Sequence, residues 1–135
     1  MAGYSGTPLK KKLGITDEMK IFLINAPENY SDLLEENISK QLVKKIEAAG
    51  FVHLFAVTKK ELEKQFNKII LSAYEDTVIW ISWYKKSAGI ATDISEDTIR
   101  EIVLPTGWVD VKVCAVSELW SGLKIVKRKS LKSKK

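Results

Sequence analysis

The residue types best suited to hold a charged ligand gather in one loop, within the stretch TVIWISWYKKSAGIATDIS at 77–95. Ammonium groups, hydroxyls and a glycine can together form a pocket for an anion. Ligands also gather where the strands of an open α/β sheet end, because backbone donors and loop side chains converge there. We therefore predict a ligand-binding site from Asn25, Trp83, Tyr84, Lys85, Lys86, Ser87, Gly89, Thr92 and Asp93.

A solvated loop is the alternative interpretation of the same residues, with Gly89 serving a turn. Glu96 and Asp97 fall in the first turn of the next expected helix, where they complement its dipole and would repel a bound phosphate. Trp83 and Tyr84 lie at a strand end, where they could line a cleft or a partner surface. At this stage both interpretations are open.

No general acid, base or nucleophile can be assembled from the sequence, so we name no catalytic residue. His53 is the single histidine and lies inside an apolar run, which predicts a packed, hydrogen-bonded core histidine. Cys114 lies inside an expected strand and is interpreted as a small buried hydrophobe. The cysteine, the histidine and the acidic residues do not occur at the spacings that are typical of metal-binding motifs. We expect no metal and no cofactor.

The elements that must position these residues alternate along the chain. Apolar runs predict strands near 20–25, 51–57, 77–83, 109–116 and 122–128. Thr58 and Glu61 form a capping box that opens a helix over 59–74, Ser95 can cap a second helix, and a turn at Ser121-Gly122 predicts an antiparallel hairpin. The segment 38–49 fits either a helix or a short strand near 42–46.

This alternation predicts a single three-layer, Rossmann-like α/β domain over 1–128, with a mostly parallel sheet and a C-terminal antiparallel hairpin. The net charge of +5 comes from the ends of the chain. Subtracting six basic groups at 127–135 and three lysines at 10–12 leaves −4 on the rest. We interpret 129–135 as a basic disordered tail and expect neither a specific nucleic-acid partner nor a membrane contact.

Two features predict a cytoplasmic protein. The chain has a single cysteine, and its N-terminus lacks an apolar segment followed by a cleavage site.

The motifs AGYSGTPLKKKLGI and VDVKVCAVSELWSGLK resemble a family of small bacterial proteins described only as a domain of unknown function. The sequence departs from that pattern at Tyr84, where a proline is usual, and at Ser117, where an acid is common. The resemblance implies a fold and no activity.

A weaker resemblance connects the strand order to the second half of a class I methyltransferase-like domain. That similarity fails at the cofactor turn, where Asn25-Ala26-Pro27-Glu28 stands instead of a glycine-rich sequence. Pro27 also removes a backbone donor. The comparison therefore implies that the usual nucleotide-cofactor loop is missing.

Two functional hypotheses follow from these observations. The first is a non-catalytic ligand-binding or protein-interaction module that uses the loop 84–95, with an unknown protein or a small anionic ligand as its partner. The alternative is a small enzyme acting on an anionic metabolite, with Lys85 or Lys86 as electrophilic groups and Asp93 as the base. The absence of an assembled catalytic set favours the first hypothesis, and the oligomeric state is open.

Overall fold

The computed structural model describes residues 8–128, so the predicted basic tail at 129–135 lies outside the described residues. Five strands form one sheet in the order β1-β2-β3-β5-β4. Their bounds are Ile21–Ile24 for β1, Phe51–Phe55 for β2, Val78–Tyr84 for β3, Trp108–Ala115 for β4 and Trp120–Lys127 for β5. In the described part of the chain, no helix is long and apolar enough to cross a membrane.

The first three strands are parallel, and β5 runs antiparallel to both β3 and β4. Parallel strands covered on both faces need nearly continuous apolar sequence, and β2 has all five of its residues buried. The predicted Rossmann-like α/β fold with a mostly parallel sheet and a C-terminal hairpin is therefore confirmed.

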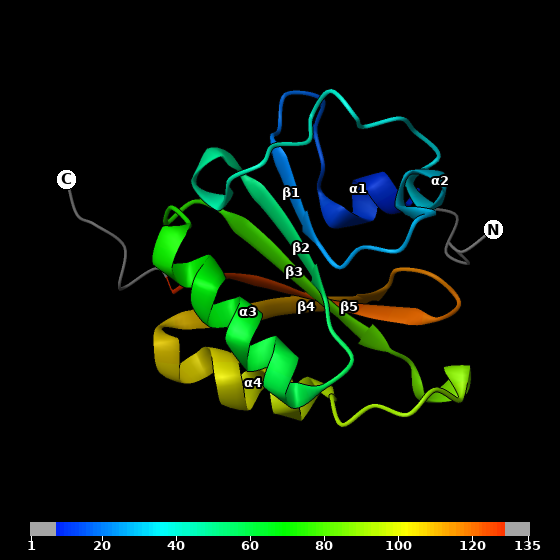
Figure 1. Cartoon of the computed structure of the whole chain (residues 1–135), viewed down its shortest axis with the longest axis vertical. Coiled ribbons are helices and arrows are strands. Elements are labelled where there is room, and N and C mark those ends of the chain that lie inside the picture. Colours follow the sequence, from blue (N-terminus) through cyan, green and yellow to red (C-terminus); the bar gives the residue numbers. More distant parts are fainter. Residues whose placement is uncertain (1–7, 129–135) are drawn as a thin grey trace.

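Helices cover both faces of the sheet, which makes three layers (Figure 1). The helices α3 (Lys59–Ser72) and α4 (Glu96–Val103) share one core with Val52 and Leu54 of β2. On the other face, α1 (Leu9–Leu13) and α2 (Tyr30–Leu34) share a second core with Phe51 and Phe55. Successive strand side chains point to opposite faces, so each strand supplies both cores.

Local sequence signals set the starts of the two longer helices. Thr58 caps α3 by accepting a hydrogen bond from the Glu61 N–H at 3.2 Å, and Ser95 caps α4 in the same way through the Thr98 N–H at 3.3 Å. The short helices α1 and α2 were not predicted, because five residues carry too little periodicity to reveal an apolar stripe.

The segment 38–49 is neither of the two structures predicted for it. Leu42 makes one isolated parallel bridge with Ile21, and a short 3-10 helix follows at Ile46–Ala48. The Ile21 N–H donates to the Gln41 carbonyl at 2.8 Å, and the Val43 N–H donates to the Ile21 carbonyl at 2.9 Å. This segment covers the free edge of β1 without extending the sheet, which protects an otherwise exposed edge.

The predicted turn at Ser121-Gly122 is also wrong. The chain reverses just before Trp120, where Ser117 Oγ accepts hydrogen bonds from the N–H groups of Leu119 and Trp120 at 3.1 and 3.2 Å. Gly122 lies within β5, and a Cβ there would approach Val116 Cγ2 to 2.8 Å. The glycine is therefore required by close contact in the sheet and not by a turn.

Candidate functional site

A groove opens where the three parallel strands end, and we call it the strand-end groove. Its volume is about 500 Å³. Residues that follow β1 and β2 form one side, while the end of β3 and the hairpin turn form the other. It is lined by Asn25, Pro27, Phe55, Ala56, Val57, Thr58, Glu61, Tyr84, Leu119 and Trp120. Ligands of open α/β sheets bind at this carboxyl edge.

A stacked aromatic pair forms one wall of the strand-end groove. The rings of Tyr84 and Trp120 lie 4.0 Å apart between centroids, with 23° between their planes. Trp120 also meets the Phe55 ring edge-on at 4.9 Å and is 7% exposed, so the core holds it in place. Tyr84 is only partly buried. This rigid wall can stack against a flat ring or attract a cation.

Polar groups complete the groove on the other side. Asn25 adopts a positive φ of 57°, the left-handed conformation that glycine or asparagine accepts most easily. The turn after β1 therefore keeps a glycine-like bend without a glycine. Glu61 Oε2 accepts a hydrogen bond from Gln65 Nε2 at 2.7 Å, which orients the carboxylate. The residues lining this groove in the described chain include Glu61 and no lysine, arginine or histidine.

The structure divides the sequence-predicted site between two grooves. Asn25 and Tyr84 line the strand-end groove, whereas a second groove of about 650 Å³, the loop groove, lies beside α4. Tyr84 faces the core shared with α1 and α2, and Trp83 faces the opposite core, because neighbouring strand residues alternate. The loop groove is lined by Trp83, Tyr84, Lys85, Lys86, Thr92, Asp93, Ile94, Ser95, Glu96, Asp97, Arg100 and Ser121.

Two of the predicted ligand-binding residues bond the loop to the segment that connects β2 with α3. Thr92 Oγ1 donates a hydrogen bond to the Val57 carbonyl at 2.5 Å. Asp93 Oδ1 accepts one from the Lys59 N–H at 2.7 Å, at the first turn of α3. This hydrogen bond uses one carboxylate oxygen of Asp93 to hold the loop, which argues against the hypothesis that Asp93 is a general base. Its role in binding a ligand stays a prediction.

The remaining loop residues have simple structural surroundings. Ser87 lies in a short 3-10 helix at Lys86–Ala88, and Gly89 ends it with a φ of 70°, as the turn interpretation expected. Neither residue lines the strand-end groove or the loop groove. Arg100 lies between Glu96 and Asp110, whose hydrogen bonds raise its pKa above the ordinary value, with the Asp110 bond contributing most.

The predicted core histidine is confirmed. His53 is fully buried, with Nδ1 2.7 Å from the Tyr30 hydroxyl and Nε2 2.8 Å from Ser82 Oγ. Burial lowers its pKa from 6.5 to about 3 and raises the pKa of Tyr30. The ring is therefore neutral at pH 7. Because it lies inside the core, this hydrogen-bonded chain holds α2, β2 and β3 together.

Cys114 is half-buried, and burial raises the pKa of its thiol, which opposes a role as a nucleophile. Across residues 8–128, no group of three or more histidine, cysteine, aspartate or glutamate side chains could hold a metal ion.

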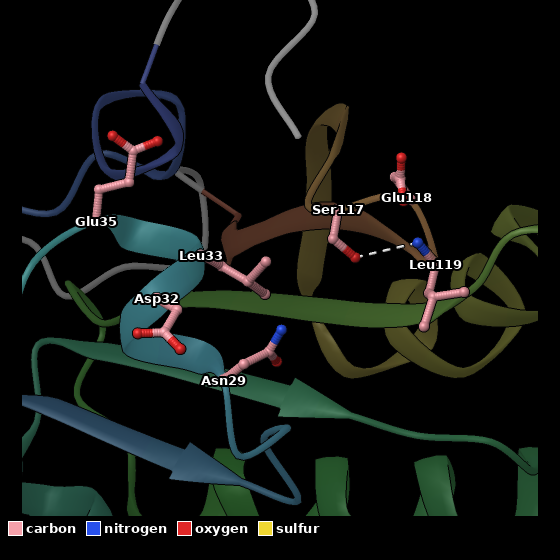
Figure 2. Close-up of a pocket in the computed structure, with 7 residues that line it drawn as sticks. All are labelled: Asn29, Asp32, Leu33, Glu35, Ser117, Glu118 and Leu119. Atoms are coloured by element: carbon pink, nitrogen blue, oxygen red, sulfur yellow. Dashed lines mark hydrogen bonds between the residues drawn. The ribbon is translucent and has the colours of Figure 1, made fainter. Parts of the chain in front are cut away.

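A third groove, the acidic groove, lies between α2 and the hairpin turn (Figure 2). Its volume is about 340 Å³. Figure 2 shows Leu33 pointing from α2 toward Ser117, with acidic side chains on both sides of the gap. Leu119 also lines the strand-end groove, so the two grooves meet at this side chain. The acidic groove is lined by Asn29, Asp32, Leu33, Glu35, Ser117, Glu118 and Leu119.

Sequence reasoning missed Glu61, Leu119 and the acidic side chains of α2 as groove residues. The carboxyl ends of all three parallel strands share one edge, and extending the search from β3 to the residues after β2 would have included Glu61. The acidic groove depends on an unpredicted helix and a misplaced turn, so no sequence signal pointed to it.

No family model and no curated protein matches the chain, so the resemblance to the small bacterial family stays a prediction. Solved structures do match. A protein of the NADB-Rossmann superfamily from Streptococcus agalactiae has a TM-score of 0.58 at 7% identity, over 95% of this chain and 71% of its own. A B. subtilis tRNA methyltransferase also has 0.58 at 7% identity, over 90% of this chain and 65% of its own.

A ribosomal protein L11 methylase from Lactobacillus delbrueckii subsp. bulgaricus has a TM-score of 0.56 at 10% identity, over 93% of this chain and 80% of its own. These similarities show a Rossmann-like fold of the kind that methyltransferases use. The interpretation of the chain as a non-catalytic module built on the loop 84–95 is therefore wrong, because the fold aligns with enzymes over nearly its whole length. The alternative of an enzyme acting on an anionic metabolite gains no support.

Proposed function

We propose that this protein is a methyltransferase that binds S-adenosylmethionine in the strand-end groove. The observation that carries the proposal is the groove itself, which combines a stacked aromatic wall with one carboxylate and, among its described lining residues, no basic side chain. It lies at the carboxyl edge of a sheet similar to those of two methyltransferases. Sequence alone pointed away from a nucleotide cofactor, so the proposal rests on side chains and not on a glycine-rich turn.

The groove residues fit a positively charged nucleoside better than a phosphorylated one. A phosphate needs backbone N–H donors or cationic side chains. Pro27 supplies no N–H, and Glu61 would repel an anion. A sulfonium nucleoside instead needs a flat surface for its base and negative or aromatic groups for its charge. Tyr84, Trp120 and Glu61 supply these features.

The residues that line the strand-end groove can then be assigned to parts of S-adenosylmethionine. Tyr84, whose ring already stacks on Trp120, would stack with the base of S-adenosylmethionine through its other face. Glu61 would stabilise the positive charge on the sulfur, and Asn25 would offer its amide to the hydroxyls of the ribose. Phe55 and Ala56 form a buried floor that excludes water. When bound, S-adenosylmethionine supplies a methyl group on a positively charged sulfur.

Isothermal titration calorimetry with three ligands tests this assignment. We expect S-adenosylmethionine to bind, adenosine to bind more weakly, and AMP to bind most weakly because Glu61 repels its phosphate. Replacing Tyr84 by alanine should weaken S-adenosylmethionine by about tenfold, since base–aromatic stacking contributes roughly 1–3 kcal/mol. Tyr84→Leu serves as a second variant that retains apolar contact with Trp120.

Tyr74→Ala is the matched control, because Tyr74 is 67% exposed and precedes β3 at the opposite edge of the sheet. We expect its affinity to equal that of the unaltered protein. Absence of heat with S-adenosylmethionine at millimolar concentration, or tighter binding of AMP, would contradict the proposal.

A further inference from the structure

Two lysines lie directly opposite each other on the C-terminal hairpin. Lys112 of β4 pairs in register with Lys124 of β5, and Lys124 is opposite Trp80 of β3 on its other side. Residues that are opposite each other on neighbouring strands share one face of the sheet, so both lysines lie on the face of Trp80, which packs with α1 and α2. Like charges at directly opposite positions destabilise a sheet. An anion bound between the two lysines would remove this repulsion.

A β-bulge produces this pair of like charges. The register of β4 shifts between Asp110 and Lys112. Asp110 lies opposite Ile125, which belongs to the core of α3 and α4, and its Oδ2 accepts a hydrogen bond from Arg100 Nε at 3.1 Å. Without the shift, residues two apart in a strand would point to the same face. The bulge therefore turns Lys112 away from the face of Asp110 and places it opposite Lys124.

Lys12, near the end of α1, brings a third positive charge to this face. The indole N–H of Trp80 donates a hydrogen bond to the Leu13 carbonyl at 3.0 Å, which holds α1 above the sheet. Burial raises the pKa of the Cys114 thiol, and the charges of Lys12 and Lys112 oppose that rise. Both ammonium groups therefore lie close to this thiol. We call the following residues the basic face: Lys12, Lys112 and Lys124.

Within residues 8–128, no ammonium group of the basic face forms a hydrogen bond or an ion pair. Lys10, in the same helix as Lys12, differs in this respect. Its Nζ lies 2.6 Å from Asp17 Oδ1 and 2.8 Å from Glu36 Oε2. These two carboxylates therefore neutralise Lys10 and not Lys12, so the lysines at 10–12 do not all have the surroundings of a solvated cluster.

The form of the basic face favours an extended polyanion over other partners. β4 is an edge of the sheet, but a bulge and a lysine on an edge strand both hinder pairing with a further strand. The three lysines line neither the strand-end groove nor the loop groove nor the acidic groove, so no enclosed small molecule is indicated. A nucleic acid presents a phosphate at each nucleotide, and lysine contacts with these phosphates supply much of its affinity for proteins.

We propose that the basic face binds the phosphate backbone of a nucleic acid. Lys112 and Lys124 contact the backbone from the hairpin, and Lys12 contacts it from α1. Phosphate contacts carry no sequence information, so this binding does not depend on the order of the bases. It goes beyond the proposed function and requires no methyl donor.

Fluorescence anisotropy on the full chain tests the proposal in the absence of S-adenosylmethionine. The probes are two fluorescein-labelled single-stranded RNAs of twenty nucleotides with different sequences, and a labelled peptide of twenty glutamates. We expect the two RNAs to bind with equal affinity, which falls as salt is raised because counterions are released from the RNA. The peptide should bind more weakly.

Variants separate the basic face from the other lysines of the chain, which also attract RNA. Lys112→Gln combined with Lys124→Gln should make the slope of log affinity against log salt shallower by about 1.4, since each phosphate contact of a single strand contributes about 0.7. Adding Lys12→Gln should bring the change to about 2.1. The control is Lys64→Gln combined with Lys68→Gln, which removes the same charge from exposed positions of α3 on the opposite face and should change the slope by less than about 0.4.

Thermal unfolding gives a second measurement on the same proteins. Removing the pair of like charges should leave the melting temperature unchanged or raise it, so weaker RNA binding would not reflect unfolding. Circular dichroism checks that each variant is folded. If the double variant fails to fold, Lys112→Gln alone, at an exposed position, should make the salt slope shallower by about 0.7.

Three results would overturn the proposal. They are no binding of either RNA at low salt, an equal change of slope in the control variant, and tighter binding of the glutamate peptide than of RNA. Calorimetry with S-adenosylmethionine uses no RNA. Failure of RNA binding with intact donor binding would therefore refute only the nucleic-acid contact, and failure of donor binding with intact RNA binding would refute only the proposed function.

Discussion

Because burial keeps His53 unprotonated in the folded chain, the protein should lose stability on mild acidification. His53 lies between Tyr30 and Ser82 with no exposed surface, and burial lowers its pKa from 6.5 to about 3. The folded pKa lies below the unfolded value, so the histidine contributes stability fully above pH 6.5 and loses that contribution as the pH falls toward 3. His53 is the only histidine in the chain, and histidine is the side chain whose ordinary pKa lies between pH 5 and pH 7.

The magnitude follows from these two pKa values. Between pH 7 and pH 5 the unfolded chain takes up a proton that the folded chain does not, and linkage gives a loss of about 1.9 kcal/mol. With a urea slope of about 1.5 kcal/mol per M, the unfolding midpoint should fall by roughly 1.3 M. The same loss should continue down to about pH 3, where protonation of carboxylates adds to it.

Urea unfolding followed by tryptophan fluorescence at pH 7, 6 and 5 measures this directly. His53→Gln retains hydrogen-bonding groups but cannot titrate, so its free energy of unfolding should be lower overall and should change little over the same range. The reasoning is refuted if the unaltered protein loses less than about 0.5 kcal/mol from pH 7 to pH 5, or if a folded His53→Gln protein shows the same slope.

Two backbone predictions complete the set. Gly122→Ala should lower the free energy of unfolding by about 1–3 kcal/mol, because its Cβ would lie 2.8 Å from Val116 Cγ2 and 3.2 Å from Trp80 Cε3. Gly50→Ala, which meets nothing within 4 Å, is the control, and an equal loss there would contradict the steric explanation. Glu35 ends α2 with a φ of 58°, so Glu35→Gly should raise stability by roughly 0.5–1 kcal/mol in thermal or urea unfolding; a loss of stability would show that the side chain contributes more than the strain costs.

Sequence predicted the parts of the fold that have strong local signals. The apolar runs at β2 and β3, and the caps at Thr58 and Ser95, are determined by residues next to one another in the chain. The core role of His53 also followed from its apolar neighbours. Such features need no knowledge of distant contacts.

The errors arose where distant contacts decide. The segment around Leu42 takes its form from the free edge of β1, which periodicity cannot reveal. Gly122 looked like a turn residue, but it is required by its approach to Trp80 and Val116 across the sheet. Residue type alone cannot distinguish these two uses of glycine.

The residues of the sequence-predicted site lie near the carboxyl ends of the parallel strands, but they are divided between two grooves. Asn25 and Tyr84 line the strand-end groove, whereas Lys85 and Lys86 line the loop groove. The division follows from the alternation of Trp83 and Tyr84 across β3. The expected anion pocket at these lysines stays a prediction.

Chemical-shift mapping by NMR, with S-adenosylmethionine added to the ¹⁵N-labelled full chain, tests the central claim most directly. The account predicts saturable shifts concentrated at the amides of Asn25, Thr58, Glu61, Tyr84 and Trp120, which line the strand-end groove. It would be contradicted if the spectrum did not change at millimolar ligand, or if the shifts were confined to the loop groove.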